Sequence, residues 1–214
     1  MKKPKRRWPI VVLVLALLTA LLGYRIWDVN QHRVTYPIQH YSMGQEVPLD
    51  GDFLDYDGEN TQGYYVNVQK AEIMDSNEYL ARYAPDVDPD SMSNGPGDVI
   101  VLTYDVRNDG NTDGFLNMVS LFLVGENKNT FYKVDSELWE ASEPRIRGNS
   151  NGLVLVPNTS YTTHLPLSCI QNPRFLEYTL DTKNYTRKDV REHSFELVLT
   201  NDPTRKIIDI SIGQ

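Results

Sequence analysis

Apolar and polar residues alternate strictly in several segments of this chain, and that alternation limits the fold more than any other feature. The clearest case is KIIDISI at 206–212, in which Asp209 and Ser211 separate Ile208, Ile210 and Ile212. Successive side chains of a strand point to opposite faces, so this segment predicts a strand with one buried face. The segment DVIVLTYDVRN at 98–108 likewise places Ile100, Leu102, Tyr104 and Val106 on one face.

Other short segments of this kind follow along the chain with turn residues between them, at 64–73, 115–124, 130–134, 152–156, 160–167 and 194–200. Many short strands separated by turns predict an all-β domain, either a sandwich or a barrel. Helix is expected only in two short segments of this domain. Residues 75–84 have an N-cap residue in Asp75 or Ser76, and residues 135–141 can form one more short helix.

The N-terminus carries a different signal. A basic stretch at 1–7 precedes an uncharged apolar run at 10–23, and Trp8 and Trp27 stand on either side of this run. A segment of about 20 residues is long enough to cross a bilayer. Tryptophans are typical of its interfaces, and Arg25 can extend to the head groups. We therefore predict one transmembrane helix at 8–27, through which the protein contacts the membrane.

The basic flank at 1–7 should stay in the cytoplasm, which places the rest of the chain outside. We expect a single-pass protein of the cell membrane, with a tether at 28–45 and an extracytoplasmic domain at 46–214. A cleaved signal peptide is the alternative, because the apolar run is also as short as a signal-peptide core. The stretch after it lacks the small-residue pattern of a cleavage site, since Leu22 stands two positions after Ala20. This absence favours an uncleaved signal anchor.

Charge and cysteine content limit the partners. Of the 21 basic residues six lie in residues 1–25, so the rest of the chain has 15 basic against 29 acidic residues. A body with this excess of acid repels a phosphate backbone, and nucleic acid is not an expected partner. Cys169 is the only cysteine, so no disulfide can form within the chain. A bacterial surface protein fits this content better than a secreted animal protein.

Two interpretations are open for the polar run NDGNTDG at 108–114, which lies between two predicted strands. As a turn, it contains the Asn, Asp and Gly residues that tolerate a positive φ. As a calcium loop, Asp109, Asn111, Asp113 and Gly114 fit the opening of an EF-hand pattern. The twelfth position is Ser120, however, where a bidentate carboxylate is required. The turn is the favoured interpretation.

Other acidic loops are weaker calcium candidates. Asp86, Asp88 and Asp90 begin like a calcium loop, but Ser91 replaces the required glycine. Another acidic loop, at 49–60, also lacks the full spacing. These loops are either simply solvated, or two acidic loops converge in the fold on one ion. The metal candidates are thus Asp86, Asp88, Asp90, Asp109 and Asp113, with calcium as the ion, and no other cofactor is expected.

Catalytic patterns are weak. Cys169 and His164 are close in sequence, but a thiol nucleophile also needs a third, orienting group. The sequence contains no G-x-S-x-G motif, no phosphate-binding glycine loop and no histidine pair with zinc spacing. Aromatic residues of the predicted strands either lie in the core or form a face that binds carbohydrate or peptide. The residues concerned include Tyr64, Tyr65, Tyr79, Tyr83, Trp139 and Tyr161.

The segment GDVIVLTYDVRNDGNTDGFLNMVSLFLVGENKNTFYKV at 97–134 resembles the centre of the bacterial immunoglobulin-like, telokin-like extracellular domains. The segment LVPNTSYTTHLPL at 155–167 resembles a later part of the same domains. The resemblance covers about residues 64–212 and implies an immunoglobulin-like β-sandwich displayed at the cell surface, without catalytic residues. The acidic insert at 84–98 departs from it, being longer than the hairpin connections of such a fold.

These observations predict a non-enzymatic binding or accessory module outside the cytoplasm, held in the membrane by residues 8–27. A protein or the cell wall is the expected partner. An exported enzyme of unfamiliar type and a structural subunit of a membrane complex are the alternatives.

Overall fold

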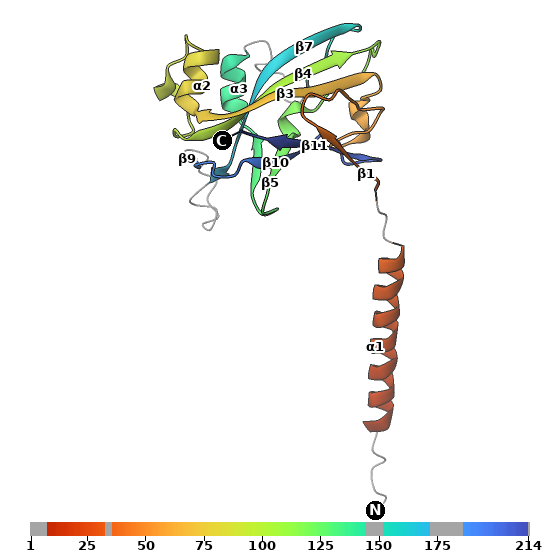
Figure 1. Cartoon of the computed structure of the whole chain (residues 1–214). Helices are drawn as coiled ribbons and strands as arrows, with labels where there is room; N and C mark the ends of the chain where they lie inside the picture. Colours follow the sequence, from red (N-terminus) through yellow and green to blue (C-terminus); the bar gives the residue numbers. More distant parts are fainter. Residues whose placement is uncertain (1–7, 33–35, 144–151, 172–185, 214) are drawn as a thin grey trace, which may run out of the picture. The chain divides into compact units, whose positions relative to one another are not determined.

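A computed structural model describes residues 8–32, 36–143, 152–171 and 186–213 (Figure 1). The chain divides into an N-terminal unit that ends at residue 35 and a domain that begins at residue 36. The N-terminal unit contains one helix. The domain is built mainly from strands.

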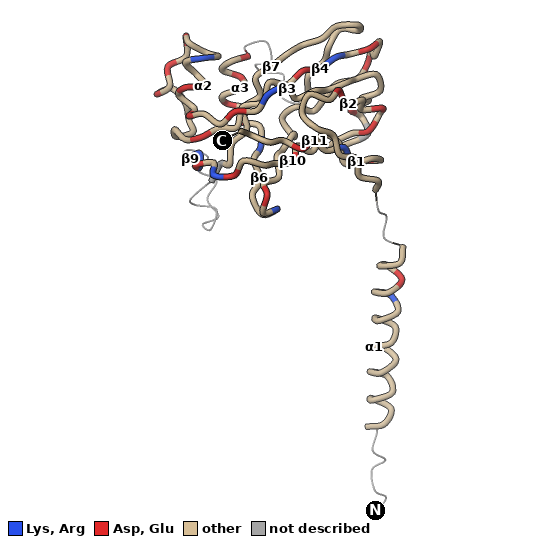
Figure 2. The backbone as a smooth tube through the Cα atoms, viewed as in Figure 1, with Lys and Arg blue, Asp and Glu red and all other residues tan. Residues whose placement is uncertain are grey.

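Helix α1, Trp8–Gln31, has 24 residues and a mean hydropathy of 2.2 in its most apolar window. Its charged residues lie only near one end, as Figure 2 shows. The helix is therefore long and apolar enough to cross a membrane, although a signal sequence would meet the same test. It continues to Gln31, past the expected end at residue 27.

A mixed, nearly closed sheet in the order β1-β11-β10-β5-β6-β7-β4-β3-β2 forms the domain. Among the described strands of this sheet, β1 and β11 are the one parallel pair. The backbone N–H of Gly44, just after β1, donates to the carbonyl of Val68 in β3 at 2.9 Å. This hydrogen bond links the edge strand β1 to β3, which is the neighbour of β2 at the other edge. The strands are β1 Ile38–Ser42, β2 Val47–Pro48, β3 Tyr64–Asp75, β4 Asp98–Asn108, β5 Phe122–Gly125, β6 Phe131–Val134, β7 Thr159–Ser168, β10 Ser194–Val198 and β11 Arg205–Ser211. A small separate pair consists of β8, Ile170–Gln171, and β9, Thr186–Arg187.

Both expected short helices are present, and they lie next to each other against β3, β4 and β7 (Figure 1). Helix α2, Ser76–Tyr83, begins after Asp75, whose side chain accepts a hydrogen bond from the backbone of Asn77. Helix α3, Ser136–Ser142, begins after Asp135, which caps it in the same way. Single 3-10 turns occur at Asp57–Glu59, Pro89–Ser91 and Met118–Ser120. The capping carboxylates explain where each helix starts, because they satisfy N–H groups that have no partner in the first turn.

The main core lies on one side of the long strands β3 and β4. Four alternate residues of β4, Ile100, Leu102, Tyr104 and Val106, are buried in it, as the sequence predicts. In β3 the alternation changes phase, because a bulge at Val68–Lys70 shifts the register against β4. Such a bulge adds one residue to a strand. It therefore turns Ala71 and Ile73 towards the same core as Val66 and Val68.

A second, smaller core covers the other face of β4. Val99 and Val101 pack there against Leu80 of α2 and Leu138 of α3. This explains why the second face of the segment at 98–108 is half apolar. The helices cover one end of β4 and leave its other end polar.

A domain built mostly of β-strands after an apolar N-terminal helix is confirmed, and the immunoglobulin-like sandwich stays a prediction. Two expected strands form only in small part. Of 115–124 only β5 forms, and of 152–156 only Leu153 pairs, in an isolated bridge with Leu116. Four of the described strands were not expected. β2, β8 and β9 have two residues each, and β1 lies inside the segment 28–45 assigned to the tether. The residues of β1 are mostly exposed, so it lacks an alternating pattern.

Candidate functional site

The sheet has one face that neither α2 nor α3 covers, formed by β1, β5, β6, β10 and β11. Leu197 and Ile208 of β10 and β11 are buried in the core. Because side chains alternate along a strand, Glu196 and Ile207 point to the opposite side. We call this side the β10–β11 face.

A groove of about 620 Å³ runs over the β10–β11 face. Ile38 and Phe131 line it, and their exposed fractions are 57% and 52%. The ring centres of Phe122 and Phe131 are 6.3 Å apart. A sheet face that meets water normally carries polar residues. Exposed apolar side chains in a groove, with charged residues around them, are typical of contact surfaces. The groove is lined by Ile38, His40, Phe122, Val124, Lys128, Phe131, Glu196, Asn201, Arg205 and Ile207.

A charged cluster lies at one side of this groove. The Nδ1 atom of His40 in β1 lies 3.0 Å from Oδ1 of Asp209 in β11. Glu196 in β10 is paired directly opposite Asp209 in the antiparallel register. One nitrogen or oxygen atom from each of these three residues lies within 4.8 Å of the other two. Lys128, in the turn between β5 and β6, forms an ion pair with Glu196.

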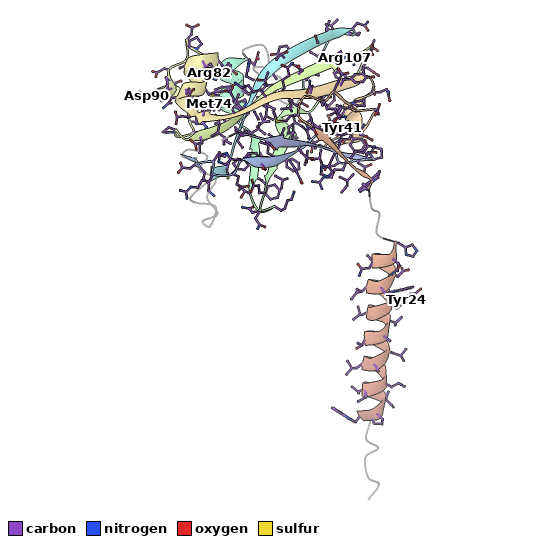
Figure 3. All side chains as sticks on the ribbon, viewed as in Figure 1. Tyr24, Tyr41, Met74, Arg82, Asp90 and Arg107 are labelled. Carbon is purple, nitrogen blue, oxygen red and sulfur yellow. The ribbon has the colours of Figure 1, made fainter. Side chains whose placement is uncertain are left out.

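A second groove, of about 230 Å³, lies over the uncovered ends of β3, β4 and β7. Figure 3 shows Arg107 at this end of the domain and Arg82 and Met74 at the other. The guanidinium of Arg107 donates to both carboxylate oxygens of Glu46, each at 3.0 Å, and lies 4.0 Å from the ring centre of Tyr65. The hydrogen bond to Glu46 raises the pKa of Arg107 above its ordinary value.

The polar groups of this second groove are largely paired with each other. Asp105 accepts hydrogen bonds from Thr162 at 2.6 Å and from Gln69. A ligand would have to break such bonds before forming its own. The β10–β11 face, on which Ile38 and Phe131 are exposed, is therefore the stronger candidate for binding.

The tyrosines and Trp139 do not gather on one face. Tyr64, Tyr79 and Trp139 are buried. Burial raises the pKa of Tyr64 and Tyr79. The indole N–H of Trp139 donates to the Thr163 hydroxyl at 3.0 Å. The half-buried rings are dispersed: Tyr65 lies under Arg107, Tyr83 stacks on His164 at 4.2 Å, and Tyr161 packs against the core.

The acidic candidates from the sequence lie in two separate places. Asp86, Asp88 and Asp90 are exposed, and the side chain of Asp88 accepts from the backbone N–H of Asp90 at 3.0 Å. Figure 3 shows Asp90 at the end of the domain opposite Arg107. Asp109 lies at the Arg107 end and pairs with that residue at 3.2 Å. Within the described residues, the one cluster with three or more metal-ligand side chains is His40, Glu196 and Asp209, which contains none of these acids.

Two of the three acidic loops do meet, and asparagines join them. Asn60 Nδ2 donates to Asp113 at 2.8 Å, and Asn117 Nδ2 donates to Asp55 at 2.7 Å. The Oδ1 atom of Asn111 accepts from the backbone of Asp113 and Gly114. The segment 108–114 is thus a loop held by its own side chains, and its carboxylates already have hydrogen-bond donors.

Comparison with protein families matches residues 38–206 to the Domain of unknown function (DUF5028). The match starts at the first residue of β1 and ends at the second residue of β11, so it includes β1, β5, β6 and β10 and only the start of β11. No curated protein and no solved structure matches this chain.

Proposed function

We propose that this chain, which belongs to the DUF5028 family, is a membrane-anchored module that binds a protein partner outside the cytoplasm. The apolar helix α1 and the basic residues before it support the anchor and its orientation. The domain acts as a binding or accessory module and not as an enzyme. An immunoglobulin-like sandwich would suit this role, because a broad sheet face is then free for contacts.

The observation that carries the proposal is the apolar groove on the β10–β11 face. Burial of a side chain such as Ile38 or Phe131 contributes about 1.5–3 kcal/mol each. Aromatic residues in the centre of an interface, surrounded by polar ones, commonly provide most of the binding energy. Phe131 and Ile38 have this arrangement, with Lys128, Glu196 and Arg205 along the same groove. The partner surface that fits is a protein segment with apolar side chains and charges of both signs beside them.

Site-specific crosslinking tests the interface in the membrane. A photoreactive amino acid replaces Phe131 in the full-length protein, and the matched control carries it at Lys70, an exposed residue of β3. We expect one crosslinked partner from position 131 and none from position 70. The partner should also be lost when Ile38→Ser is added to the crosslinking variant. Equal crosslinking from both positions, or crosslinking to lipid alone from position 131, would overturn the proposal.

The anchor needs its own test. An uncleaved anchor keeps residues 1–27 in the mature protein and holds it in the membrane after washing with high salt. N-terminal sequencing and fractionation measure both properties. A mature N-terminus near Tyr24, or release into the medium, would contradict the anchor but leave the binding face untouched.

A further inference from the structure

We propose that His40, Glu196 and Asp209 bind a first-row divalent metal ion, with Zn²⁺ as the representative ion. The inference goes beyond the proposed function and does not depend on a protein partner, since metal binding is measurable on the chain alone. It stands on three side chains from three adjacent strands of the β10–β11 face.

The positions of the donor atoms suit a shared ion. A zinc ion holds nitrogen and oxygen ligands at about 2.0–2.2 Å, which places tetrahedral ligands roughly 3.4 Å apart. His40 Nδ1 and Asp209 Oδ1 are 3.0 Å apart, and the three residues offer atoms within 4.8 Å of one another. Side-chain rotations would have to bring all three donor atoms onto one ion. His40 and Asp209 are about half exposed, and the ion would replace the hydrogen bond that joins them.

The backbone holds these ligands in place. β10 and β11 are antiparallel neighbours, and Glu196 is directly opposite Asp209. β1 pairs with the other side of β11, where His40 is opposite Ile207, two residues before Asp209. Ligands on paired strands are positioned more exactly than ligands on loops.

Charge favours a cation at this point. Like charges directly opposite each other on neighbouring strands are destabilising, and Glu196 and Asp209 form such a pair. Lys128 pairs with Glu196, and the imidazole of His40 pairs with Asp209. A divalent ion between the two carboxylates would offset both and would use the imidazole as its third ligand.

The ligand set indicates the class of metal. An imidazole nitrogen suits zinc and other first-row transition ions, whereas calcium and magnesium prefer oxygen ligands alone. Three protein ligands leave at least one coordination position for water or for a group of a bound molecule. Because the cluster lies beside the groove, that open position would face the same surface.

Substitution of Lys128 distinguishes a metal site from an ion pair with a structural role only. Its ammonium group occupies the carboxylate of Glu196, so it competes with a metal ion for this ligand. Lys128→Met should therefore bind metal more tightly than the wild type. Removal of a ligand should have the opposite effect. Even residues that only orient a metal ligand change affinity by about 10–100-fold, so His40→Gln and Asp209→Asn should each weaken binding at least about tenfold.

The experiment uses the full chain in detergent, without a polyhistidine tag. Calorimetric titration with Zn²⁺ gives affinity and stoichiometry, and the visible absorption of Co²⁺ reports the ligand geometry. His164→Gln is the matched control, because His164 lies on β7 and stacks on Tyr83. We expect one ion per chain, a weaker complex in His40→Gln and Asp209→Asn, a tighter one in Lys128→Met, and no change in the control.

Three results would overturn the inference: no saturable binding to the wild type, unchanged binding in His40→Gln and Asp209→Asn, or unchanged binding in Lys128→Met. Circular dichroism of each variant shows whether it is folded. All three substituted residues have exposed side chains, so folding should be retained. Loss of metal binding with intact crosslinking at position 131 would leave the proposed protein interface standing.

Discussion

The Nε atom of Arg187 donates a hydrogen bond to Oδ2 of Asp135 at 2.7 Å, and the two side chains are 1% and 0% exposed. Asp135 also accepts from the hydroxyl of Ser168, at 2.8 Å. Arg187 also donates to the carbonyls of Asn94 and Gly95, at 3.1 and 2.8 Å. This buried pair therefore fastens the acidic insert at 84–98 to β7, β9 and α3. The long insert is a fixed part of the domain.

Loss of Arg187 should be strongly destabilising. Arg187→Met leaves the carboxylate of Asp135 buried without its counter-charge, which costs about 3–5 kcal/mol of unfolding free energy. Arg82→Met is the matched control, because Arg82 forms an exposed pair with Glu78 that is worth less than about 1 kcal/mol. Urea denaturation of both variants measures the difference. Equal midpoints would show that the pair contributes little.

A sequence cannot reveal this pair, because Asp135 and Arg187 are 52 residues apart and neither lies in a motif. Local signals were more informative for the long elements. The strand predicted at 98–108 has the bounds of β4. Its apolar residues are regularly spaced because one face packs in the main core and the other in the smaller core. The bulge in β3 was not visible in the sequence, because it depends on pairing with β4.

The isoleucine face of β11 gives a direct test of the sheet assignment. Ile210 is 1% exposed, so Ile210→Asp buries an unpaired charge and should cost about 4 kcal/mol or more. Ser211→Asp is the control, because Ser211 is the next residue of β11 and its side chain is exposed. This substitution should change the free energy of unfolding by less than about 0.5 kcal/mol. Thermal and urea unfolding measure both. A tolerated Ile210→Asp would refute the inward direction of this residue.

Stability should fall at alkaline pH because of buried tyrosines. Burial raises the pKa of Tyr132 to about 12 and also raises that of Tyr104. In the unfolded chain a tyrosine has a pKa of about 10. Between about pH 10 and 12 the unfolded state therefore loses protons that the folded state keeps, and the free energy of unfolding decreases as pH rises.

Tyr104→Phe should make this decrease shallower, by up to about 1.4 kcal/mol per pH unit. Tyr56→Phe, an exposed residue, is the control. Urea unfolding at several values above about pH 9 gives the slope. An identical slope in Tyr104→Phe and the wild type would show that Tyr104 does not titrate differently in the two states.

The candidate site was less predictable than the fold. Asp209 was expected to point outward, because it alternates with isoleucines. His40 lies in β1, within the segment for which the sequence predicts a tether, and Glu196 lies 13 residues before Asp209. Their proximity results from the parallel pairing of β1 with β11, which joins the start of the domain to its end. Strands this far apart in the sequence pair without leaving any pattern in the residues of either strand.

The acidic loops lead to the last prediction, which concerns calcium. β4 has 11 residues and separates the loop at 86–98 from that at 108–114. At about 3.3 Å per residue these loops are tens of ångströms apart and cannot share an ion. The loop at 50–59 does meet the loop at 108–114, but there Asn60 already donates to Asp113.

Calcium needs six to eight oxygen ligands, and the described residues of these loops form no cluster that provides them. A weak site occupied at a few times its dissociation constant stabilises a protein by only about 1 kcal/mol. We therefore expect at most a small shift in melting temperature between chelator and excess calcium. Asp88→Asn and Asp113→Asn should melt like the wild type in both conditions, as should the control Asp189→Asn, whose side chain is 75% exposed. A large, saturable shift that either of the first two variants abolishes, and the control keeps, would establish a calcium site.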